Sequence, residues 1–206
     1  MNKVVRTSLI TAQAGALLLT AQAALAQQAS AETTPREDKH YVGLMVTAFN
    51  HRTIGQSAEA AWGTGGTLVV GGHITDTFHA EVRAGGGFQD AKVPRGDLNL
   101  AVDHFASWYI GLHHAITDYA NLYGQFGFSY IAGTGKLPSP EADRNGQFRD
   151  LEGEFPDSGF SVSWLAGLDF EVMDDTFLVF EGGKLFEDTG SEVNTFQFSG
   201  GVRYEF

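Results

Sequence analysis

Residues 194–206 read NTFQFSGGVRYEF and form the last stretch of the chain. The apolar side chains of this stretch lie at even positions and the polar side chains at odd positions: Phe196, Phe198, Val202, Tyr204 and Phe206 against Thr195, Gln197, Ser199, Arg203 and Glu205. Because successive side chains of a strand point to opposite faces, this alternation predicts a β-strand with one apolar and one polar face.

The same stretch carries a polar residue, a glycine and two aromatic residues at the very end: Ser199, Gly201, Tyr204 and Phe206. This pattern resembles the C-terminal insertion signal of bacterial outer-membrane β-barrels. The resemblance implies that the last strand closes a barrel and that the barrel-assembly machinery recognises it.

The amino-terminal residues 1–26 are typical of a secretory signal peptide. Lys3 and Arg6 precede an apolar segment around Leu17–Leu19, and Ala24-Leu25-Ala26 forms a small-x-small cleavage site. The apolar segment is shorter than the roughly 18 residues of a membrane-spanning helix. Residues 27–39 are polar and are predicted to be a flexible leader. The chain is therefore expected to be exported, with its fold confined to residues 40–206.

The composition limits the function further. The chain holds 25 Asp and Glu against 13 Lys and Arg, and this acidity disfavours nucleic-acid binding. It has no cysteine, which excludes disulfides and thiol chemistry. A frequent use of Phe and Gly without a long apolar run is typical of a spanning barrel, because only one face of each strand is apolar.

Three hairpins repeat one design, with alternating strands joined by short turns that contain Asp. They cover residues 65–88, 107–131 and 160–186. The other connections, at 51–62, 89–103, 132–158 and 187–193, are long and polar. A further strand, at 40–50, is apolar on both faces, so its inward face is left open. The pattern predicts an all-β fold: a closed antiparallel up-and-down transmembrane β-barrel of about eight strands.

The aromatic side chains of the strands decide between a membrane barrel and a soluble ligand-carrying barrel of the lipocalin type. They share the apolar face, as lipid-facing girdles do: Phe78, Trp108, Phe126, Phe128, Tyr130, Phe160, Trp164, Phe170, Phe198 and Tyr204. The mature chain resembles the small eight-stranded outer-membrane proteins of the OmpX, OmpA-domain and opacity type. The outer membrane is therefore the expected location, and the soluble carrier is the alternative.

The opposite face is predicted to fill the interior with paired polar groups, because an eight-stranded barrel has room for little else. This interior polar cluster comprises His73, Glu81, Arg83, His113, Tyr123, Gln125, Asp169, Glu181, Arg203 and Glu205, with His79 as a further hydrogen-bonding group. Lys184 does not fit, since alternation from Glu181 turns it outward. It requires either a bulge or a side chain that reaches the headgroups.

The expected role is non-catalytic: support of the envelope or presentation of surface loops. A lipid A-modifying enzyme needs a nucleophile, a base and an acid held together. His113 and His114 face opposite sides, however, and no His-x-Ser pair of the deacylase kind occurs. A narrow channel for small solutes is the other membrane alternative, and it needs a water path past Arg83 and Arg203.

The long connections carry most of the unpaired acid, including Asp90, Asp97, Asp103, Glu141, Asp143, Asp150, Glu152, Glu154, Asp157, Glu187, Asp188 and Glu192. Asp143-Arg144-Asn145-Gly146 does not match a calcium-binding EF-hand loop, because the glycine comes too early. No metal site or cofactor is predicted. The expected partners are outer-membrane lipid and lipopolysaccharide, and the protein is expected to be a monomer. The third connection, with Phe148, Leu151 and Phe155, is the expected binding surface.

Overall fold

The computed structural model describes residues 36–54, 60–93, 97–139, 141, 143 and 146–206. The signal peptide predicted at 1–26 and most of the leader predicted at 27–39 lie outside these ranges, as do Pro140, Arg144 and Asn145. None of the described helices has the length and hydropathy of a transmembrane helix.

Eight long antiparallel strands form the wall of a closed barrel in the described part of the chain. They are β1 (His40–Arg52), β2 (Ala60–His73), β3 (Phe78–Gln89), β5 (Leu98–Thr117), β6 (Ala120–Lys136), β8 (Ser161–Met173), β9 (Thr176–Glu187) and β10 (Asn194–Glu205). Each strand pairs with its neighbours in sequence, and β1 also pairs with β10. This last pairing closes the wall, so no long strand has a free edge. The predicted fold class is confirmed.

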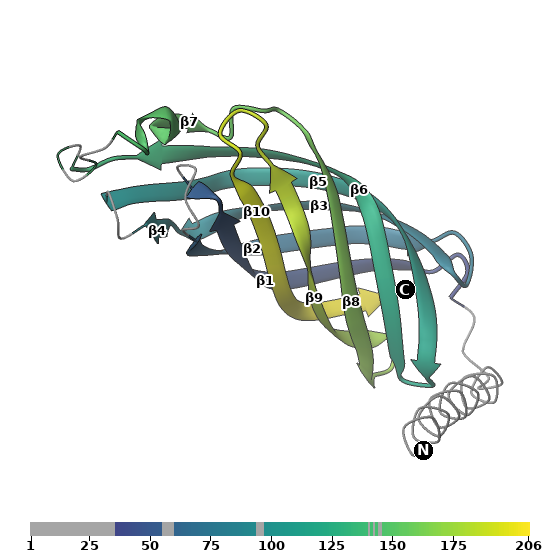
Figure 1. The fold of residues 1–206 in the computed structure, drawn as a ribbon. Helices are drawn as coiled ribbons and strands as arrows, with labels where there is room; N and C mark the ends of the chain where they lie inside the picture. The colour runs from purple at the N-terminus through teal and green to yellow at the C-terminus, as the bar shows by residue number, and fades with distance from the viewer. Residues whose placement is uncertain (1–35, 55–59, 94–96, 140, 142, 144–145) are drawn as a thin grey trace, which may run out of the picture.

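The two ends of the barrel differ. At one end, here called the turn end, residues 74–77, 118–119 and 174–175 make short connections. At the other, the loop end, β4 (Ala91–Val93) and β7 (Gly153–Phe155) pair with extensions of β5 and β6, beside the single-turn helix η3 (Arg149–Leu151). Figure 1 shows that β4 and β7 both lie at the loop end, away from the turns of the hairpins.

Side chains alternate between the interior and the outer face along each strand. In β10, Thr195, Gln197 and Arg203 are buried, while Phe198 and Val202 are exposed. Of the ten aromatic residues predicted to face lipid, all lie on the outer face, with Tyr130 and Phe170 half-buried and the others exposed. The barrel thus presents an apolar outer surface around an interior that holds many polar groups.

The structure assigns the face of β1 that the sequence left open. Tyr41, Met45 and Phe49 are buried inside the barrel, whereas Leu44 and Val46 are 69% and 64% exposed on the outer face. One of these inward side chains packs against a charged group: the guanidinium of Arg203 lies 4.9 Å from the centre of the Tyr41 ring. Tyr41 therefore takes part in the interior polar network as well as in packing.

Lys184 lies on the outer face, half-buried, and its ammonium group pairs with Glu187. The β9–β10 register shifts immediately afterwards, since Phe196 faces Lys184 and Thr195 faces Phe186. The intervening Leu185 is the extra residue of this bulge, and both Leu185 and Phe186 are buried. The sequence required either a bulge or an outward side chain of Lys184. The structure has both, next to each other in β9.

The interior at the loop end is apolar. Its buried cluster contains Ile54, Ala61, Ala91, Val93, Leu98, Leu100, Leu137, Phe148, Leu151, Phe155 and Val193. Phe148, Leu151 and Phe155 are at most 3% exposed, so the apolar residues of the third connection do not form the outward binding surface that was expected. They fold into the barrel opening, because burying them removes apolar surface from water.

Candidate functional site: the interior at the turn end

All ten residues of the predicted interior polar cluster are buried inside the barrel. They come from seven strands: His73 from β2, Glu81 and Arg83 from β3, His113 from β5, Tyr123 and Gln125 from β6, Asp169 from β8, Glu181 from β9, and Arg203 and Glu205 from β10. The alternation of each strand directs these groups inward, and the closure of the barrel brings them together.

Arg83 is the centre of the first group of charges and is 1% exposed. It pairs with Glu81 and with Glu181, and its Nη2 donates to Glu181 Oε2 at 2.8 Å. The hydroxyl groups of Tyr41 and Tyr123 donate to Glu81 at 2.9 Å and to Glu181 at 2.7 Å. A buried charge without such partners is strongly unfavourable, so this network fixes four strands to one another.

Arg203 is the centre of the second group. Its Nη2 donates to Asp169 at 2.6 Å and lies 3.4 Å from Glu205 Oε1. Asn121 also donates to Asp169, at 2.6 Å. The guanidinium lies 5.3 Å from the centre of the Phe177 ring. Arg203 thus joins the carboxylates of β8 and β10 at the turn end.

Arg36, from the leader, completes the network, and the sequence analysis did not identify it. Its side chain is buried in the barrel opening, where it pairs with Glu205, with Nε donating to Oε2 at 3.0 Å. Its Nη1 lies 3.9 Å from Asp169. The described end of the predicted leader is therefore held against the barrel. The sequence held a signal for a third interior cation, because the predicted interior had four carboxylates and only two arginines.

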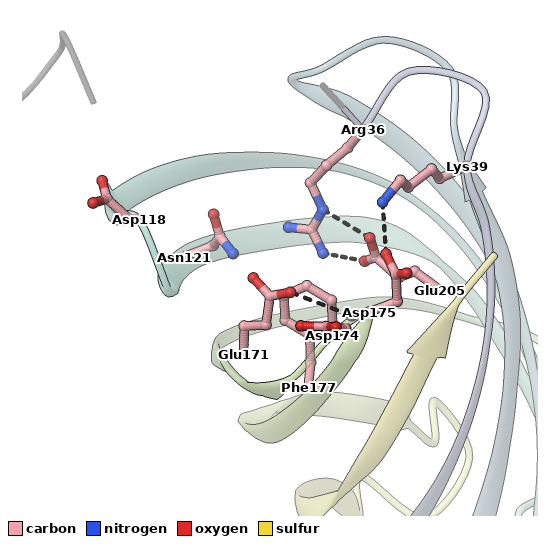
Figure 2. A pocket seen from close by; sticks show the side chains of 9 residues that line it. All are labelled: Arg36, Lys39, Asp118, Asn121, Glu171, Asp174, Asp175, Phe177 and Glu205. Carbon is pink, nitrogen blue, oxygen red and sulfur yellow. Dashed lines mark hydrogen bonds and ion pairs between the residues drawn. The ribbon is translucent and has the colours of Figure 1, made fainter. Parts of the chain in front are cut away.

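A cavity of about 220 Å³ lies beside Arg36 at the turn end. Figure 2 shows Arg36 reaching down to Glu205 and Lys39 pairing with Asp175, at 2.7 Å. The cavity is lined mainly by acidic and polar residues: Arg36, Lys39, Asp118, Asn121, Glu171, Asp174, Asp175, Phe177 and Glu205. Its five carboxylates against two cations favour cations over anions.

Three histidines gather deeper in the same end: His73, His79 and His113. One ring nitrogen from each lies within 4.8 Å of one from each of the others, and all three residues are buried. Strand register explains the cluster. His73 faces His79 across β2–β3, and His79 faces Gly111, two residues from His113. The residues were assigned inward from sequence, but their convergence depends on a register that the sequence alone does not show.

The inward serines bond to other hydroxyl groups. Ser107 Oγ lies 2.6 Å from Ser129 Oγ, and Tyr109 bonds to Ser163. On the outer face His114 is exposed, while His113 points inward, as their neighbouring positions predict. Among the described residues, these serines are hydrogen-bonded to hydroxyl groups rather than to the histidine that a deacylase-type nucleophile needs.

The end of the chain pairs with its beginning. Phe206 and His40 exchange two backbone hydrogen bonds of 2.8 and 2.9 Å. Of the predicted insertion-signal residues, Ser199 is buried in the interior, Gly201 is half-buried in the wall, and Tyr204 and Phe206 stack on the outer face. The sequence pattern of the last strand is thus placed on the β1–β10 seam.

Residues 14–206 match the family model described as outer membrane protein beta-barrel domain. The chain belongs to this family. It is an outer-membrane β-barrel protein, so the turn end faces the periplasm and the loop end faces the cell exterior, as is general for such barrels.

Two solved structures illustrate the shared fold. Ail, the attachment invasion locus protein of Yersinia pestis, solved with the heparin analogue sucrose octasulfate, is 13% identical with a TM-score of 0.56, covering 82% of this chain and 99% of that one. Neisserial surface protein A (NspA) is 16% identical with a TM-score of 0.53, covering 82% and 100%. At this identity the likeness concerns the fold alone. No curated protein sequence matches the chain.

Proposed function

We propose that this outer-membrane barrel is a sealed, non-catalytic protein that supports the cell envelope and presents its loops at the surface. The observation that carries the proposal is the closure of the interior at both ends. Arg36, Arg83 and Arg203 are paired with carboxylates at the turn end, and an apolar core fills the loop end. Apolar packing and paired charges leave little room for a hydrated solute.

The acidic loops support an association with lipopolysaccharide through divalent cations. Exposed carboxylates remain at the loop end, among them Asp90, Asp103, Glu141, Glu152 and Glu192. Hard divalent cations prefer such oxygen ligands and can bridge them to lipid phosphates. A sulfated sugar of the kind bound in the Ail structure is not proposed, because an anion would be repelled by this acidic surface.

Two further partners follow from the same placement. The outward aromatic belt contacts membrane lipid, and the last strand is the element proposed to be recognised by the barrel-assembly machinery. Tyr204 and Phe206 lie on its outer face, beside the seam that closes last if β1 and β10 join at the end of assembly. We expect the protein to act as a monomer.

Conductance in planar bilayers tests the proposal directly. The refolded barrel is expected to give no ion current above that of the bilayer, because the interior is blocked at both ends. A variant with Phe148→Ala and Leu151→Ala is the matched comparison, because it removes two large side chains from the apolar core at the loop end. Steady single-channel current from the unaltered barrel would contradict the sealed structure and favour the channel alternative.

A second experiment tests the envelope role. Deletion of the protein is expected to sensitise cells to detergent combined with a chelator, and a variant that keeps the barrel but has neutralised loop acids is expected to restore protection only in part. Full resistance of the deletion strain would contradict a role in envelope integrity. Hydrolysis or transfer of a lipid A acyl chain by the purified protein would instead show an enzyme.

A further inference from the structure

We propose that His73, His79 and His113 form a binding site for one divalent transition-metal ion inside the barrel, with Zn²⁺ as the representative ion. Three strands contribute one ligand each, β2, β3 and β5. Neutral imidazole nitrogen is a preferred ligand of zinc, copper and nickel ions, and three histidines with an open fourth position form a known zinc ligand set.

The geometry fits after a small adjustment. Nitrogens bound to tetrahedral Zn²⁺ at about 2.0–2.1 Å lie about 3.3 Å from one another. In this structure one nitrogen from each ring lies within 4.8 Å of the others. Ring centres are 4.8 Å apart for His73–His113, 5.7 Å for His79–His113 and 6.0 Å for His73–His79. Small side-chain rotations therefore bring three nitrogens to coordination distance.

The second observation is that each ring leaves one nitrogen without a partner. Nδ1 of His73, His79 and His113 is buried and makes no hydrogen bond among the described residues. The three residues are 5%, 4% and 8% exposed. An unsatisfied buried polar atom costs about 1–3 kcal/mol. Other buried atoms of the described interior also lack a partner, among them Nε of Arg203 and both amide atoms of Gln197, but the three Nδ1 atoms stand out because their rings lie together. A metal ion bound by the three Nδ1 atoms would satisfy all of them.

The surrounding groups can orient the ligands. Nε2 of His73 lies 3.2 Å from Glu205 Oε1, the carboxylate–histidine arrangement that fixes the ring of a metal ligand. Nε2 of His79 lies 2.6 Å from the side-chain amide of Gln125. With a metal ion on Nδ1, the His79 proton moves to Nε2, and Gln125 must turn its amide to accept it. This turn replaces the 3.3 Å hydrogen bond that Gln125 Oε1 accepts from Arg83 with two donors facing each other, so the Gln125 side chain must also shift away from Arg83.

The wall itself is shaped around the cluster. At Gly111 of β5, a Cβ atom would overlap the ring of His79 and the Cγ atom of Gln125. The absence of a side chain there leaves the space that His79 occupies opposite β5. The glycine in β5 thus provides the space for the His79 ring, so the position of the ring depends on the strand beside it.

The charge of the interior also suits a cation. Four buried carboxylates, Glu81, Asp169, Glu181 and Glu205, face three buried guanidinium groups, those of Arg36, Arg83 and Arg203. One negative charge therefore remains when the histidines are neutral, and this charge attracts a cation; a divalent ion changes the sum from −1 to +1. The acidic cavity at the turn end lies next to the cluster, since Glu205 both lines the cavity and contacts His73.

Cobalt and zinc titrations of the full chain test the site. The protein is purified in detergent, stripped with a chelator and titrated with Co²⁺ alone. One equivalent is expected to bind with the intense visible absorption of a tetrahedral, nitrogen-containing site, and Zn²⁺ is expected to abolish the signal by displacement. Loop carboxylates give only the weak absorption of octahedral, oxygen-bound Co²⁺, so the spectrum separates the two.

The neighbouring histidines of β5 supply a matched pair of variants. His113→Asn removes a ligand and is expected to weaken binding by at least about 100-fold. His114→Asn changes the adjacent, outward residue and is expected to leave binding unchanged. A Glu205→Gln variant is expected to weaken binding about tenfold, because the orienting carboxylate is lost.

Two results would overturn the proposal: no saturable tetrahedral signal in the unaltered protein, or equal affinities for the two asparagine variants. Heat-modifiable migration on gels confirms that each variant is folded. If His113→Asn does not fold, the unaltered protein still decides, because its cobalt spectrum alone reports the ligands.

Discussion

The two halves of the barrel interior are filled in opposite ways. At the turn end, charged groups are held by bonds that cross from strand to strand, with Arg83 contacting Glu81 and Glu181. At the loop end, the interior is apolar and consists largely of side chains from the connections, such as Phe148 and Leu151. The turn-end half therefore belongs to the wall, whereas the loop-end half is a cap folded onto it.

This difference has an energetic consequence. In a buried ion pair each charge is stabilised by the other, so removing one member leaves an unpaired charge in a medium of low dielectric constant. An apolar cap loses stability only in proportion to the surface and volume removed. Changes at the turn end should weaken the whole barrel, while changes at the loop end should open the cap locally.

The largest effect is expected from Arg83→Met. Glu81 and Glu181 would remain buried without their common cation, and the free energy of unfolding is expected to fall by about 3–5 kcal/mol. Urea unfolding of the refolded protein in lipid measures the change. The double variant Arg83→Met with Glu181→Gln removes a charge of each sign and should recover part of the loss. A loss below about 1 kcal/mol in the single variant would show that water reaches this group.

Phe148→Ala tests the other half. Phe148 is 1% exposed in the apolar cap, and truncating a buried phenylalanine costs about 3–5 kcal/mol. We expect this loss to appear as protease cleavage in the 137–160 connection, with heat-modifiable migration of the barrel preserved. The outward Phe160→Ala is the control, since it leaves the cap intact. Loss of the folded gel band in Phe148→Ala would contradict the separation of the two halves.

Sequence patterns predicted the wall well and the interior only in part. In β10, the alternation correctly predicted which residues face inward, because one set of alternate positions is polar and the other is apolar. The same reasoning left the faces of β1 open, because both are apolar, and in the structure Tyr41 and Met45 lie inward. Arg36 was missed because it lies in a segment without periodicity, and the histidine cluster because it depends on strand register. The cap was missed because apolar residues of a long loop do not reveal what they pack against.

Arg36→Ala is expected to have an intermediate effect. Glu205 would lose its contacts with Arg36 but keep Arg203, 3.4 Å away, and His73, 3.2 Å away. The expected loss in unfolding free energy is about 1–3 kcal/mol, smaller than for Arg83→Met. The same urea experiment measures it, and Lys39→Ala is the control, because Lys39 pairs with Asp175 at a half-exposed site. Equal effects of the two variants would show that Arg36 does not act as an interior residue.

The smallest effect concerns a carboxylate of the cap. Asp188 is buried and accepts hydrogen bonds from the backbone of Asp157, at 3.2 Å, and Ser158, at 3.1 Å. Burial alone would raise the pKa of the Asp188 carboxyl, but hydrogen bonds from Ser191 and Ser158 outweigh it and lower the pKa below its ordinary value.

Asp143 has a similar structural role, because its carboxylate accepts hydrogen bonds from the backbone of Gln147 at 2.9 Å and of Phe148 at 3.0 Å. These two acids are thus part of the fold, rather than unpaired loop charges.

Because the pKa of Asp188 is lower in the folded cap than in the unfolded one, its contribution to stability is complete above the ordinary pKa of about 3.9 and is lost as the pH falls below that value. We expect protection of the Asp157 and Ser158 amides from hydrogen exchange to decrease over this range, after correction for intrinsic exchange. The amide of His113, bonded to the Thr77 carbonyl at 2.9 Å, is the control at the turn end. Asp188→Asn should lower protection of the two cap amides roughly fivefold at neutral pH, equivalent to about 1 kcal/mol, and remove the pH dependence. A parallel decrease at His113 would show that the barrel opens as one unit, and the cap would then not be separable from the wall.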